Sequence, residues 1–455
     1  MDKKIKNIFI ENLFGFLNHD INLTDEGVTF IHGPNGCGKT TLLRLIESFF
    51  RWNVSSLFEI NFENMTISYS TGESIVIQKH KKIKNYEEER LEFPILNFSI
   101  ANAETNFEPF EISRDVKESE VQPSEIDHFI PFLKRVAPGE WINRENGERL
   151  SYFEVMEKFP HRLPSPHIKK RPEWLRYYQN LTKLYFIETQ RLIKVGHNET
   201  HQLRLFDEQI RLFDEQNVTE VIRLYSDEIK KQISYKLAES ASVTQSKDRS
   251  FPERVLSMRP DESISEEKIR NDYENTEKKI QKLMEAGLID QEKNISLPIK
   301  KLEETEKKVL ALHLKDINEK LSIFDELQQK IETFTGIISP KFRNKNFRIN
   351  RKHGFVFEAT QGQESMLNPA QLSSGEQHQI VLFYELIFKS GENSLSLIDE
   401  PEISLHVDWQ RQFLEDILKI AKLGNHNFLI ATHSPQIIGS RRDLAVPLDG
   451  GILGG

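Results

Sequence analysis

The sequence predicts an α/β fold in two lobes, with a long helical insertion between them. Near both ends of the chain, an apolar segment of strand character runs into a loop rich in glycine or carboxylate, at Gly33–Thr41 and at Asp399–Glu402. The residues between them are rich in helix formers. We therefore expect an N-terminal lobe over residues 1–195, a helical and coiled-coil insertion over 196–338 and a C-terminal lobe over 339–455.

Short strands build the predicted N-terminal lobe. The expected strands are Lys4–Ile10, Asp20–Leu23, Val28–His32, Met65–Tyr69, Ser74–Lys79 and Leu184–Ile187. Thr71-Gly72 is placed to turn a hairpin between two of them. A helix is expected over Lys39–Phe50, directly after the glycine-rich loop. Residues 93–180 reveal no chemistry.

Two segments of the insertion have the apolar spacing of coiled-coil helices. Steps of four and three residues alternate from Ile269 to Leu283 and again from Leu310 to Phe324. Gly287 and Pro298 interrupt the helical pattern between them, so we expect the two segments to form a short antiparallel hairpin. The repeat of RLFDEQ, at 204–209 and 211–216, is interpreted as duplication of one heptad.

The glycine-rich loop has the pattern of a phosphate-binding loop, or Walker A motif. Its glycines let backbone N–H groups close around phosphate oxygens, and the helix that follows adds its positive end. Lys39 suits the β and γ oxygens of ATP, and the Thr40 hydroxyl suits Mg²⁺. The expected nucleotide-binding residues of this loop are Asn35, Gly36, Gly38, Lys39, Thr40 and Thr41. Cys37, the single cysteine, is interpreted as a position that has to be small.

Two loops near the C-terminus carry residues suited to hydrolysis. The apolar strand Leu395–Ile398 ends in Asp399 and Glu400, as a Walker B strand does. Asp399 suits the Mg²⁺ shell, and Glu400 suits a general base that orients water for attack on the γ-phosphate. His433, which follows a second apolar strand, is the expected switch residue for the same phosphate. Catalysis is therefore predicted to rest on Glu400 and His433, and metal binding on Thr40 and Asp399.

A signature motif, LSSGEQ, spans residues 372–377. It places Ser373 and Gly375 before a predicted helix, where they can bind the γ-phosphate of ATP that another subunit holds. The chain has one such motif, so a complete site needs a second copy. We therefore expect an ATP-dependent head-to-head dimer, with a higher homo-oligomer as an open alternative.

The order and wide separation of these motifs resemble the SMC-like branch of the ATP-binding-cassette (ABC) ATPases, which includes RecF and the ATPase half of OLD-family nucleases. The resemblance implies a bilobal ABC-type ATPase head that uses ATP and Mg²⁺. It places Gln190 as the Q-loop residue, with Gln78 as a rival. DEPE followed by Leu405-His406 and Trp409-Gln410 is similar to the OLD-type and defence-system group, although Val407 stands where proline is usual.

OLD nucleases continue from the switch histidine into a Toprim nuclease domain, whereas this chain ends about 20 residues later, so the resemblance implies a separate effector protein. In size and layout the chain is most similar to the ATPases of PARIS anti-phage systems; Septu-like and retron-associated ATPases share the motifs. The expected function is a slow, regulated ATPase that senses a phage-encoded trigger and controls a Toprim-type nuclease or toxin. A RecF-like DNA-repair ATPase that clamps DNA is the alternative. A scaffold in which ATP mainly holds the dimer together is a third reading.

Composition limits the remaining possibilities. No apolar run approaches the roughly 18 to 20 residues that span a bilayer, and the N-terminus lacks a signal peptide, so a cytoplasmic protein is expected. A net charge of −9 argues against a protein coated with nucleic acid. Six basic residues nevertheless cluster between positions 341 and 352, and they suit either a solvated hairpin or a contact with DNA or an acidic partner: Lys341, Arg343, Lys345, Arg348, Arg351 and Lys352.

His197 and His201 have helical spacing but no third ligand nearby, which argues against a metal site.

Overall fold

The computed structural model divides the chain into two compact units. It describes residues 3–86, 89–103, 105, 107–113, 123–137, 139–144, 146–159, 171–188, 215–257, 265–290, 301–360, 366–391, 393–424 and 426–448. Unit 1 consists of Met1–Gln190, Ser390–Ile403 and Gln410–Gly455, and unit 2 of Arg191–Lys389 and Ser404–Trp409. This is a different partition from the predicted division at residues 195 and 338, which stays a prediction.

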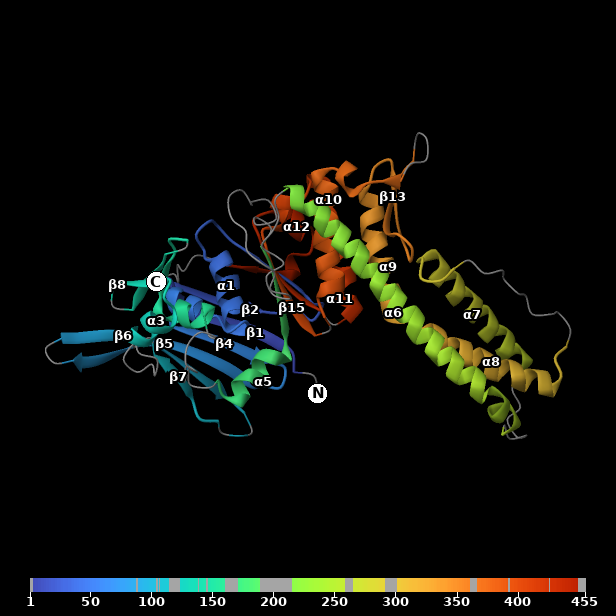
Figure 1. Ribbon diagram of the computed structural model, residues 1–455, viewed down its shortest axis with the longest axis horizontal. Helices are drawn as coiled ribbons and strands as arrows, with labels where there is room; N and C mark the ends of the chain where they lie inside the picture. Colours follow the sequence, from blue (N-terminus) through green and yellow to red (C-terminus); the bar gives the residue numbers. More distant parts are fainter. Residues whose placement is uncertain are drawn as a thin grey trace. The chain divides into compact units, whose positions relative to one another are not determined.

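Unit 1 contains an antiparallel sheet of six strands in the order β2-β1-β4-β5-β6-β7 (Figure 1). Its strands are β1 (Ile5–Leu13), β2 (Leu17–Asn22), β4 (Asn64–Tyr69), β5 (Ser74–Tyr86), β6 (Glu89–Ala101) and β7 (Phe110–Ser113). Burial alternates along β2 and β4, as expected for a sheet with one face on a core. β4 and β5 form the predicted hairpin across Thr71-Gly72, where Gly72 has a φ of +90°.

A second sheet of unit 1 is parallel, in the order β11-β15-β16-β3-β17. Its strands are β3 (Val28–His32), β11 (Lys183–Glu188), β15 (Ser394–Asp399), β16 (Asn427–Thr432) and β17 (Ala445–Pro447). All six residues of β15 are buried, which is typical of a strand covered on both faces. Because the strands are parallel, the loops that follow β3, β15 and β16 leave the same edge of the sheet.

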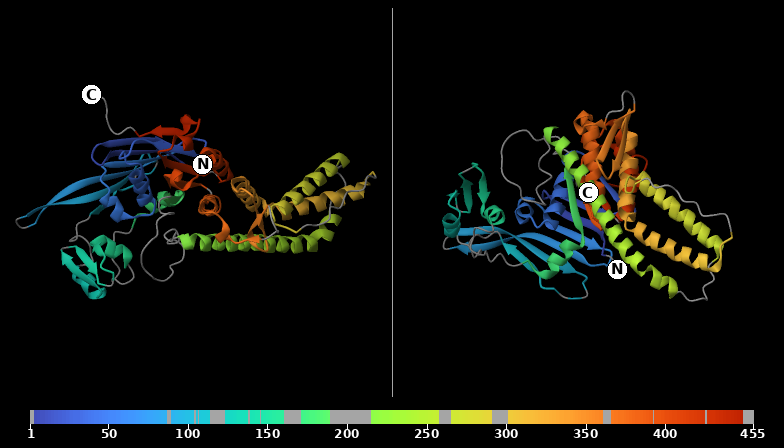
Figure 2. Two further views of the ribbon diagram at one scale, coloured as in Figure 1. Left: turned by 90° about the horizontal axis from the view of Figure 1, so that it is seen from above. Right: turned by 45° about the vertical axis from the view of Figure 1, so that its right-hand side comes forward.

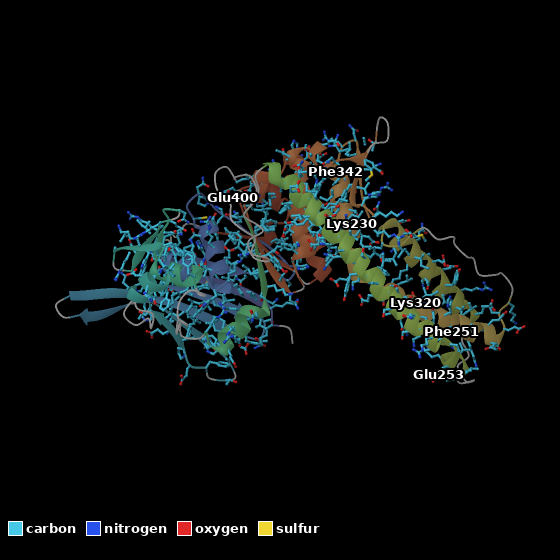
Figure 3. The ribbon with its side chains drawn as sticks, in the orientation of Figure 1. Lys230, Phe251, Glu253, Lys320, Phe342 and Glu400 are labelled. Carbon is cyan, nitrogen blue, oxygen red and sulfur yellow. The ribbon has the colours of Figure 1, made fainter. Side chains whose placement is uncertain are left out.

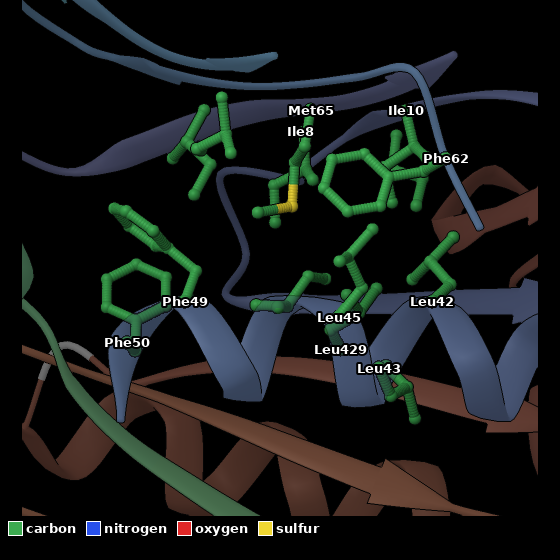
Figure 4. Close-up of a cluster of buried hydrophobic side chains, with 14 of the residues drawn as sticks. Ile8, Ile10, Leu42, Leu43, Leu45, Phe49, Phe50, Phe62, Met65 and Leu429 are labelled. Carbon is green, nitrogen blue, oxygen red and sulfur yellow. The ribbon is translucent and has the colours of Figure 1, made fainter. Parts of the chain in front are cut away.

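Helix α1 (Lys39–Phe50) lies between the two sheets and carries the main core of unit 1. Figure 4 shows its side chains Leu42, Leu45 and Phe49 among residues of the antiparallel sheet such as Ile8 and Met65. Leu429 of β16 belongs to the same buried cluster. Helix α1 is thus fixed by apolar burial on two sides, and it holds the loop that precedes it in place.

Smaller elements complete unit 1. The other helices are α2 (Val54–Glu59), α3 (Pro123–Phe129), α4 (Tyr152–Lys158), α5 (Glu173–Leu181), α11 (Val407–Gly424), whose first residues lie in unit 2, and α12 (Pro435–Ile438). Short 3-10 turns cover Pro401–Ser404 and Arg442–Leu444. Strands β8 (Leu133–Ala137), β9 (Glu140–Asn143) and β10 (Arg149–Ser151) form a separate antiparallel sheet with its own core around Trp141.

Three long helices form the insertion in unit 2 (Figures 1 and 2): α6 (Glu215–Leu256), α7 (Glu266–Glu285) and α8 (Glu304–Ser322). The predicted packing of the two heptad segments is present, because Ile269, Leu302 and Leu314 share a buried cluster. The predicted α/β fold with a helical insertion is therefore confirmed.

The predicted direction of the helix pair, however, is wrong. Contacts join the starts of α7 and α8, where the Leu302 N–H donates to Glu266, and also positions further along both helices, where Asn318 Nδ2 donates to Thr276 Oγ1 at 2.9 Å. The two helices therefore run parallel, and α6 is the antiparallel partner of α8. Gly287 does lie just after the end of α7, with a φ of +72°.

Salt bridges between α6 and α8 fix the far end of the insertion, where Figure 3 labels Phe251 and Glu253. The Arg254 guanidinium donates to both oxygens of Asp316 at 2.6 and 2.7 Å. This pair holds the pKa of the Asp316 carboxyl below its usual value, with burial as a smaller opposing effect. Lys320 lies 3.4 Å from Asp248 at the same end. Asp248 and Arg254 thus join α6 to α8.

The rest of unit 2 is a small sheet with helices around it. Its elements are α9 (Asp325–Ile338), a 3-10 turn (Ser339–Lys341), β12 (Lys345–Asn350), β13 (Gly354–Ala359), β14 (Met366–Leu367), a second 3-10 turn (Pro369–Gln371), α10 (Ser374–Tyr384) and a π-helix (Glu385–Lys389). Aromatic side chains such as Phe334, Phe347 and Phe355 fill its core. Within the ranges given above, no helix has the length and apolar character needed to cross a membrane.

Candidate functional site

The phosphate-binding loop joins β3 to α1 in unit 1. Gly36 and Gly38 have φ angles of +86° and +88°, a region that side chains other than glycine rarely adopt. A Cβ on Gly33 would lie 2.5 Å from the carbonyl oxygen of Leu448 and 2.8 Å from the Cys37 sulfur. The loop therefore needs glycine at Gly36 and Gly38 because of their backbone conformation, and at Gly33 because a side chain would not fit there.

The Lys39 side chain is folded into this loop. It is 5% exposed, and its Nζ donates to the carbonyl oxygens of Gly33 at 2.9 Å and Pro34 at 3.2 Å. These dipoles hold the ammonium group without neutralising it. Thr40 and Thr41 are half-buried in the first turn of α1, and Asn35 is exposed at the tip of the loop. This arrangement fits a phosphate group, because a positive charge, a helix N-terminus and backbone N–H groups converge on one loop.

The turn between β1 and β2 closes the loop from the side, and sequence reasoning missed it. A Cβ on Gly38 would lie 2.8 Å from Leu13 Cδ2 and 3.3 Å from Phe14 Cε2. Phe14 has a φ of +58° and is 40% exposed, an unusual backbone conformation for an aromatic residue. His19 lies behind it, and burial lowers the pKa of its imidazole. The adjacent Phe14-Gly15 pair is the one local signal that could have indicated this turn.

Glu400 and His433 meet at the ends of β15 and β16. In the parallel register Asp399 lies opposite Ala431, and Thr432 lies opposite His32 of β3, so all three strand ends are neighbours. Glu400, labelled in Figure 3, has a φ of +49°, and its N–H donates to the Ala431 carbonyl at 2.8 Å. Its Oε1 lies 3.6 Å from His433 Nε2. Unit 1 therefore brings the phosphate loop, Asp399, Glu400 and His433 to one edge of the parallel sheet.

Two side chains to which the sequence analysis assigned no role at the site, Glu402 and Gln410, hold the peptide around His433. The Glu402 carboxylate accepts hydrogen bonds from the Thr432 hydroxyl at 2.8 Å and from the His433 N–H at 2.6 Å. The Ser434 hydroxyl donates to Gln410 Oε1 at 3.0 Å, and Gln410 Nε2 donates to the Glu402 carbonyl at 3.2 Å. The partners lie tens of residues apart in sequence, which is why local patterns did not reveal them.

The signature motif belongs to unit 2. Ser373 is exposed and caps α10, and its hydroxyl accepts a hydrogen bond from the Glu376 N–H at 3.3 Å. The Glu376 carboxylate accepts the Ser373 N–H at 2.7 Å and the Lys345 ammonium at 2.7 and 2.9 Å. A Cβ on Gly375 would lie 3.1 Å from the Trp409 ring. The motif thus presents Ser373 to solvent on a rigid turn.

The basic cluster after Pro340 is largely used inside unit 2. Lys345 binds Glu376, Arg348 pairs with Glu358, and Arg351 pairs with Asp290. Lys341 is 5% exposed and lies over the Phe383 ring, and Arg343 lies 3.8 Å from Asp408. Lys352 is exposed in the turn of the hairpin. Four of the six charges therefore lie beside an acidic side chain of the same unit.

Other predicted positions are less informative. Gln190, His197, His201 and most of the RLFDEQ repeat lie outside the described residues. The rival Q-loop position, Gln78, is an exposed residue of β5 in the antiparallel sheet. Among the described residues, no group of three or more His, Cys, Asp or Glu side chains could hold a metal by itself. A metal here would need ligands such as the Thr40 hydroxyl and phosphate oxygens.

The fold and the phosphate-binding loop define the class of protein, a P-loop ATPase. The chain belongs to the AAA_15 family, described as an AAA ATPase domain, which matches residues 4–438.

Two curated proteins resemble parts of the chain. The cytochrome c biogenesis ATP-binding export protein CcmA of Rickettsia bellii is 37% identical over 67 residues, which are 14% of this chain and 33% of that protein. The UvrABC system protein A of Oceanobacillus iheyensis is 33% identical over 127 residues, or 28% of this chain and 12% of that protein. The chain thus matches about a third or less of the length of these relatives.

Solved structures of SMC head domains are distantly similar. The Smc head domain of Pyrococcus furiosus, bound to the C-terminal domain of ScpA, has a TM-score of 0.34 and 12% identity, covering 99% of this chain and 95% of that one. The SMC head domain from Thermotoga maritima has a TM-score of 0.29 and 10% identity, covering 97% and 92%. At these scores the likeness carries no functional assignment.

Proposed function

We propose that this chain is an SMC-like ABC ATPase that dimerises around ATP and controls a separate effector protein in anti-phage defence. The observation that carries the enzymatic part is the meeting of the phosphate loop, Asp399, Glu400 and His433 at one edge of the parallel sheet. ATP hydrolysis needs a phosphate cradle, a metal ligand, a base and a γ-phosphate contact, and these residue types supply all four.

The residues at this edge fit Mg²⁺ together with ATP. Thr40 would offer its hydroxyl, and Asp399, 8% exposed at the end of β15, its carboxylate. Bound Mg²⁺ supplies charge neutralisation on the phosphate oxygens. Lys39 adds a second positive charge, and carbonyl oxygens of the loop hold its ammonium group in place.

Glu400 and His433 have separate roles in this proposal. The Glu400 carboxylate orients a water molecule and takes its proton during attack on the γ-phosphate. His433 donates a hydrogen bond to that phosphate. Its Nε2 lies 3.6 Å from Glu400 Oε1, so the position of the histidine ring also depends on the position of the base. The left-handed backbone of Glu400 turns the chain sharply at the end of β15, which separates the base from the metal ligand Asp399.

The exposed signature motif supports an ATP-dependent dimer. Ser373 and Gly375 stand at the start of α10, and the turn that carries them is held by a carboxylate and a lysine of the same unit. A second copy would bring its own signature motif to the ATP bound by the first, and the dimer is therefore expected to form only with nucleotide.

Control of a partner is supported by the architecture and by resemblance. The helical insertion α6–α8 supplies an extended protein surface, and the motif layout is similar to the ATPases of PARIS systems, which restrain a separate Toprim-type effector. The DNA-clamp alternative loses support, because internal contacts occupy most of the basic cluster at 341–352.

The test is an affinity purification of the Glu400→Gln protein from its native cell, with ATP, Mg²⁺ and nuclease treatment, followed by mass spectrometry. A stoichiometric nuclease or toxin supports effector control. DNA-repair proteins, or a partner that disappears with the nucleic acid, would favour the DNA clamp. The matched control is Lys39→Ala, which removes ATP binding and should lose any partner that depends on the ATP dimer.

A further inference from the structure

We propose that Glu402 is a positioning residue for ATP hydrolysis, which fixes the switch histidine by binding its backbone. The inference rests on the proposed role of His433 and deepens it. Glu402 lies outside the expected catalytic pair, two residues after the proposed base Glu400.

The hydrogen bonds of Glu402 are divided between two neighbouring residues. One carboxylate oxygen accepts the His433 N–H at 2.6 Å, and the other accepts the Thr432 hydroxyl at 2.8 Å. Hydrogen bonds to a carboxylate are stronger than those between neutral groups. The last residue of β16 and the first residue after it are therefore tied to the turn that follows β15.

Gln410 completes a closed ring of contacts. It binds the Glu402 carbonyl with its amide nitrogen at 3.2 Å and accepts the Ser434 hydroxyl at 3.0 Å. The Ser434 N–H in turn donates to the Thr432 hydroxyl oxygen at 3.0 Å. Three consecutive residues, Thr432 to Ser434, are thus held by two side chains. We call Glu402 and Gln410 the histidine clamp.

The position of the His433 imidazole depends on this clamp through its backbone, because the ring is only partly buried. The His433 side chain is 34% exposed, whereas Thr432 and Ala431 before it are fully buried. The position of a partly exposed ring depends on the position of its own backbone. The backbone N–H of His433 is bound by Glu402. A shift of about 1 Å in a reacting group can cost about a hundredfold in rate.

The clamp also links the switch to the base. Glu400 and Glu402 occupy one turn, and the Glu400 N–H donates to the Ala431 carbonyl at 2.8 Å. Three hydrogen bonds therefore join the end of β15 to the end of β16, one from Glu400 and two from Glu402. A movement of the Glu400 backbone therefore changes the position of His433, and a movement of His433 changes the position of Glu400.

The experiment measures single-turnover ATP hydrolysis and ATP binding for Glu402→Ala, Glu402→Gln, His433→Ala and the double variant Glu402→Ala/His433→Ala. Glu402→Ala is expected to lower the hydrolysis rate about 10- to 100-fold with ATP affinity within about twofold, because the phosphate loop lies on other elements. Glu402→Gln should recover most of the rate, since its amide can accept the His433 N–H and donate to Thr432. Glu415→Ala, an exposed glutamate of α11, is the matched control.

The double variant tests whether Glu402 acts through His433. If Glu402 acts through His433, the double variant hydrolyses ATP at the rate of His433→Ala, within about twofold. Losses that multiply, or a Glu402→Gln protein as slow as Glu402→Ala, would overturn the clamp while leaving the proposed ATPase intact. A His433→Ala protein with the wild-type rate would instead remove the histidine from the proposed function, and the clamp with it.

Discussion

Charged side chains are stabilised differently around the phosphate loop and around the signature motif. In unit 1, Lys39 is held by two carbonyl oxygens, and Glu402 by a hydroxyl and a backbone N–H. In unit 2, Lys345 and Glu376 neutralise each other at 2.7 Å. Within the described residues, neither Lys39 nor Glu402 forms an ion pair.

We infer that the difference separates the charges that we propose to act in ATP binding and hydrolysis from charges that stabilise the fold. A lysine held by dipoles keeps its positive charge for phosphate oxygens, whereas an ion pair has little attraction left for a ligand. Dipoles still offset part of the cost of burying a charge. The signature turn needs only rigidity, and a partly buried ion pair with good geometry supplies it. The comparison predicts that variants in unit 1 lose function and variants at Lys345 and Glu376 lose stability.

The largest effect is expected for Lys39→Ala. It removes the one ammonium folded into the loop, so ATP affinity should fall by at least about a hundredfold, while the unfolding midpoint without nucleotide changes little. Titration with a fluorescent ATP analogue and thermal unfolding measure the two quantities. Unchanged ATP affinity would remove Lys39 from the phosphate site and end the comparison.

Glu376→Ala should have the opposite profile. It leaves the Lys345 ammonium, whose side chain is 21% exposed, without its carboxylate and the Ser373 N–H without its acceptor, so we expect a loss of about 2–3 kcal/mol in the free energy of unfolding. Denaturant unfolding measures this loss.

The matched control for Glu376→Ala is the double variant Lys345→Met/Glu376→Gln, which removes both charges and keeps an acceptor for Ser373. It should regain most of the stability. A double variant as unstable as Glu376→Ala would show that the charge pair is not what holds the signature turn.

Local motifs could be read from the sequence because each requires specific residues in adjacent positions. The phosphate loop needs glycines at Gly36 and Gly38 for positive φ angles, and the lysine and threonine must follow at once. The Walker B strand is also local, since an apolar run followed by Asp399 and Glu400 determines both burial and chemistry. The strands and the helix expected beside these motifs are present as β3, α1 and β15, while the roles of the site residues stay predictions.

The contacts that support the site could not be read in the same way. Glu402 binds Thr432 and His433, some thirty residues away, and Phe14 packs on Gly38. The same limit explains the helical insertion. Heptad spacing predicts that two helices pack, but it is identical for parallel and antiparallel pairs, so the parallel course of α7 and α8 followed only from contacts.

Substitution of one glycine in each unit extends the comparison between the phosphate loop and the signature motif, and the expected effects are smaller. Gly38 has a φ of +88° and would place a Cβ 2.8 Å from Leu13, whereas Gly375 would place one 3.1 Å from the Trp409 ring. Gly38→Ala should therefore cost about 1–2 kcal/mol from backbone strain and weaken ATP binding. Gly375→Ala should cost about 1 kcal/mol or less, change the fluorescence of Trp409 and leave ATP affinity of the monomer unchanged. Trp409→Phe provides the background signal, and equal losses of ATP affinity would contradict the distinction.

Glu385 of unit 2 differs from the Lys345–Glu376 pair, and it offers the smallest and most specific test. Burial raises the pKa of its carboxyl, although the Tyr225 hydroxyl and the charge of Lys389 act in the opposite direction. Lys389 is itself paired with Glu228 at 2.6 Å, so it compensates Glu385 only in part. Because the folded-state pKa lies above the ordinary value of 4.5, this carboxyl lowers stability as pH rises through its folded-state pKa, and it has no such cost below its unfolded-state pKa.

Glu385→Gln keeps a partner for Tyr225 and removes the charge. It should raise the unfolding midpoint by about 1–3 °C at pH 8 and leave it unchanged at pH 4, where the wild-type carboxyl already holds its proton. Glu332→Gln, at an exposed position of α9, controls for the loss of one negative charge. A gain of equal size at both pH values would mean that packing, and not the buried charge, limits this part of unit 2.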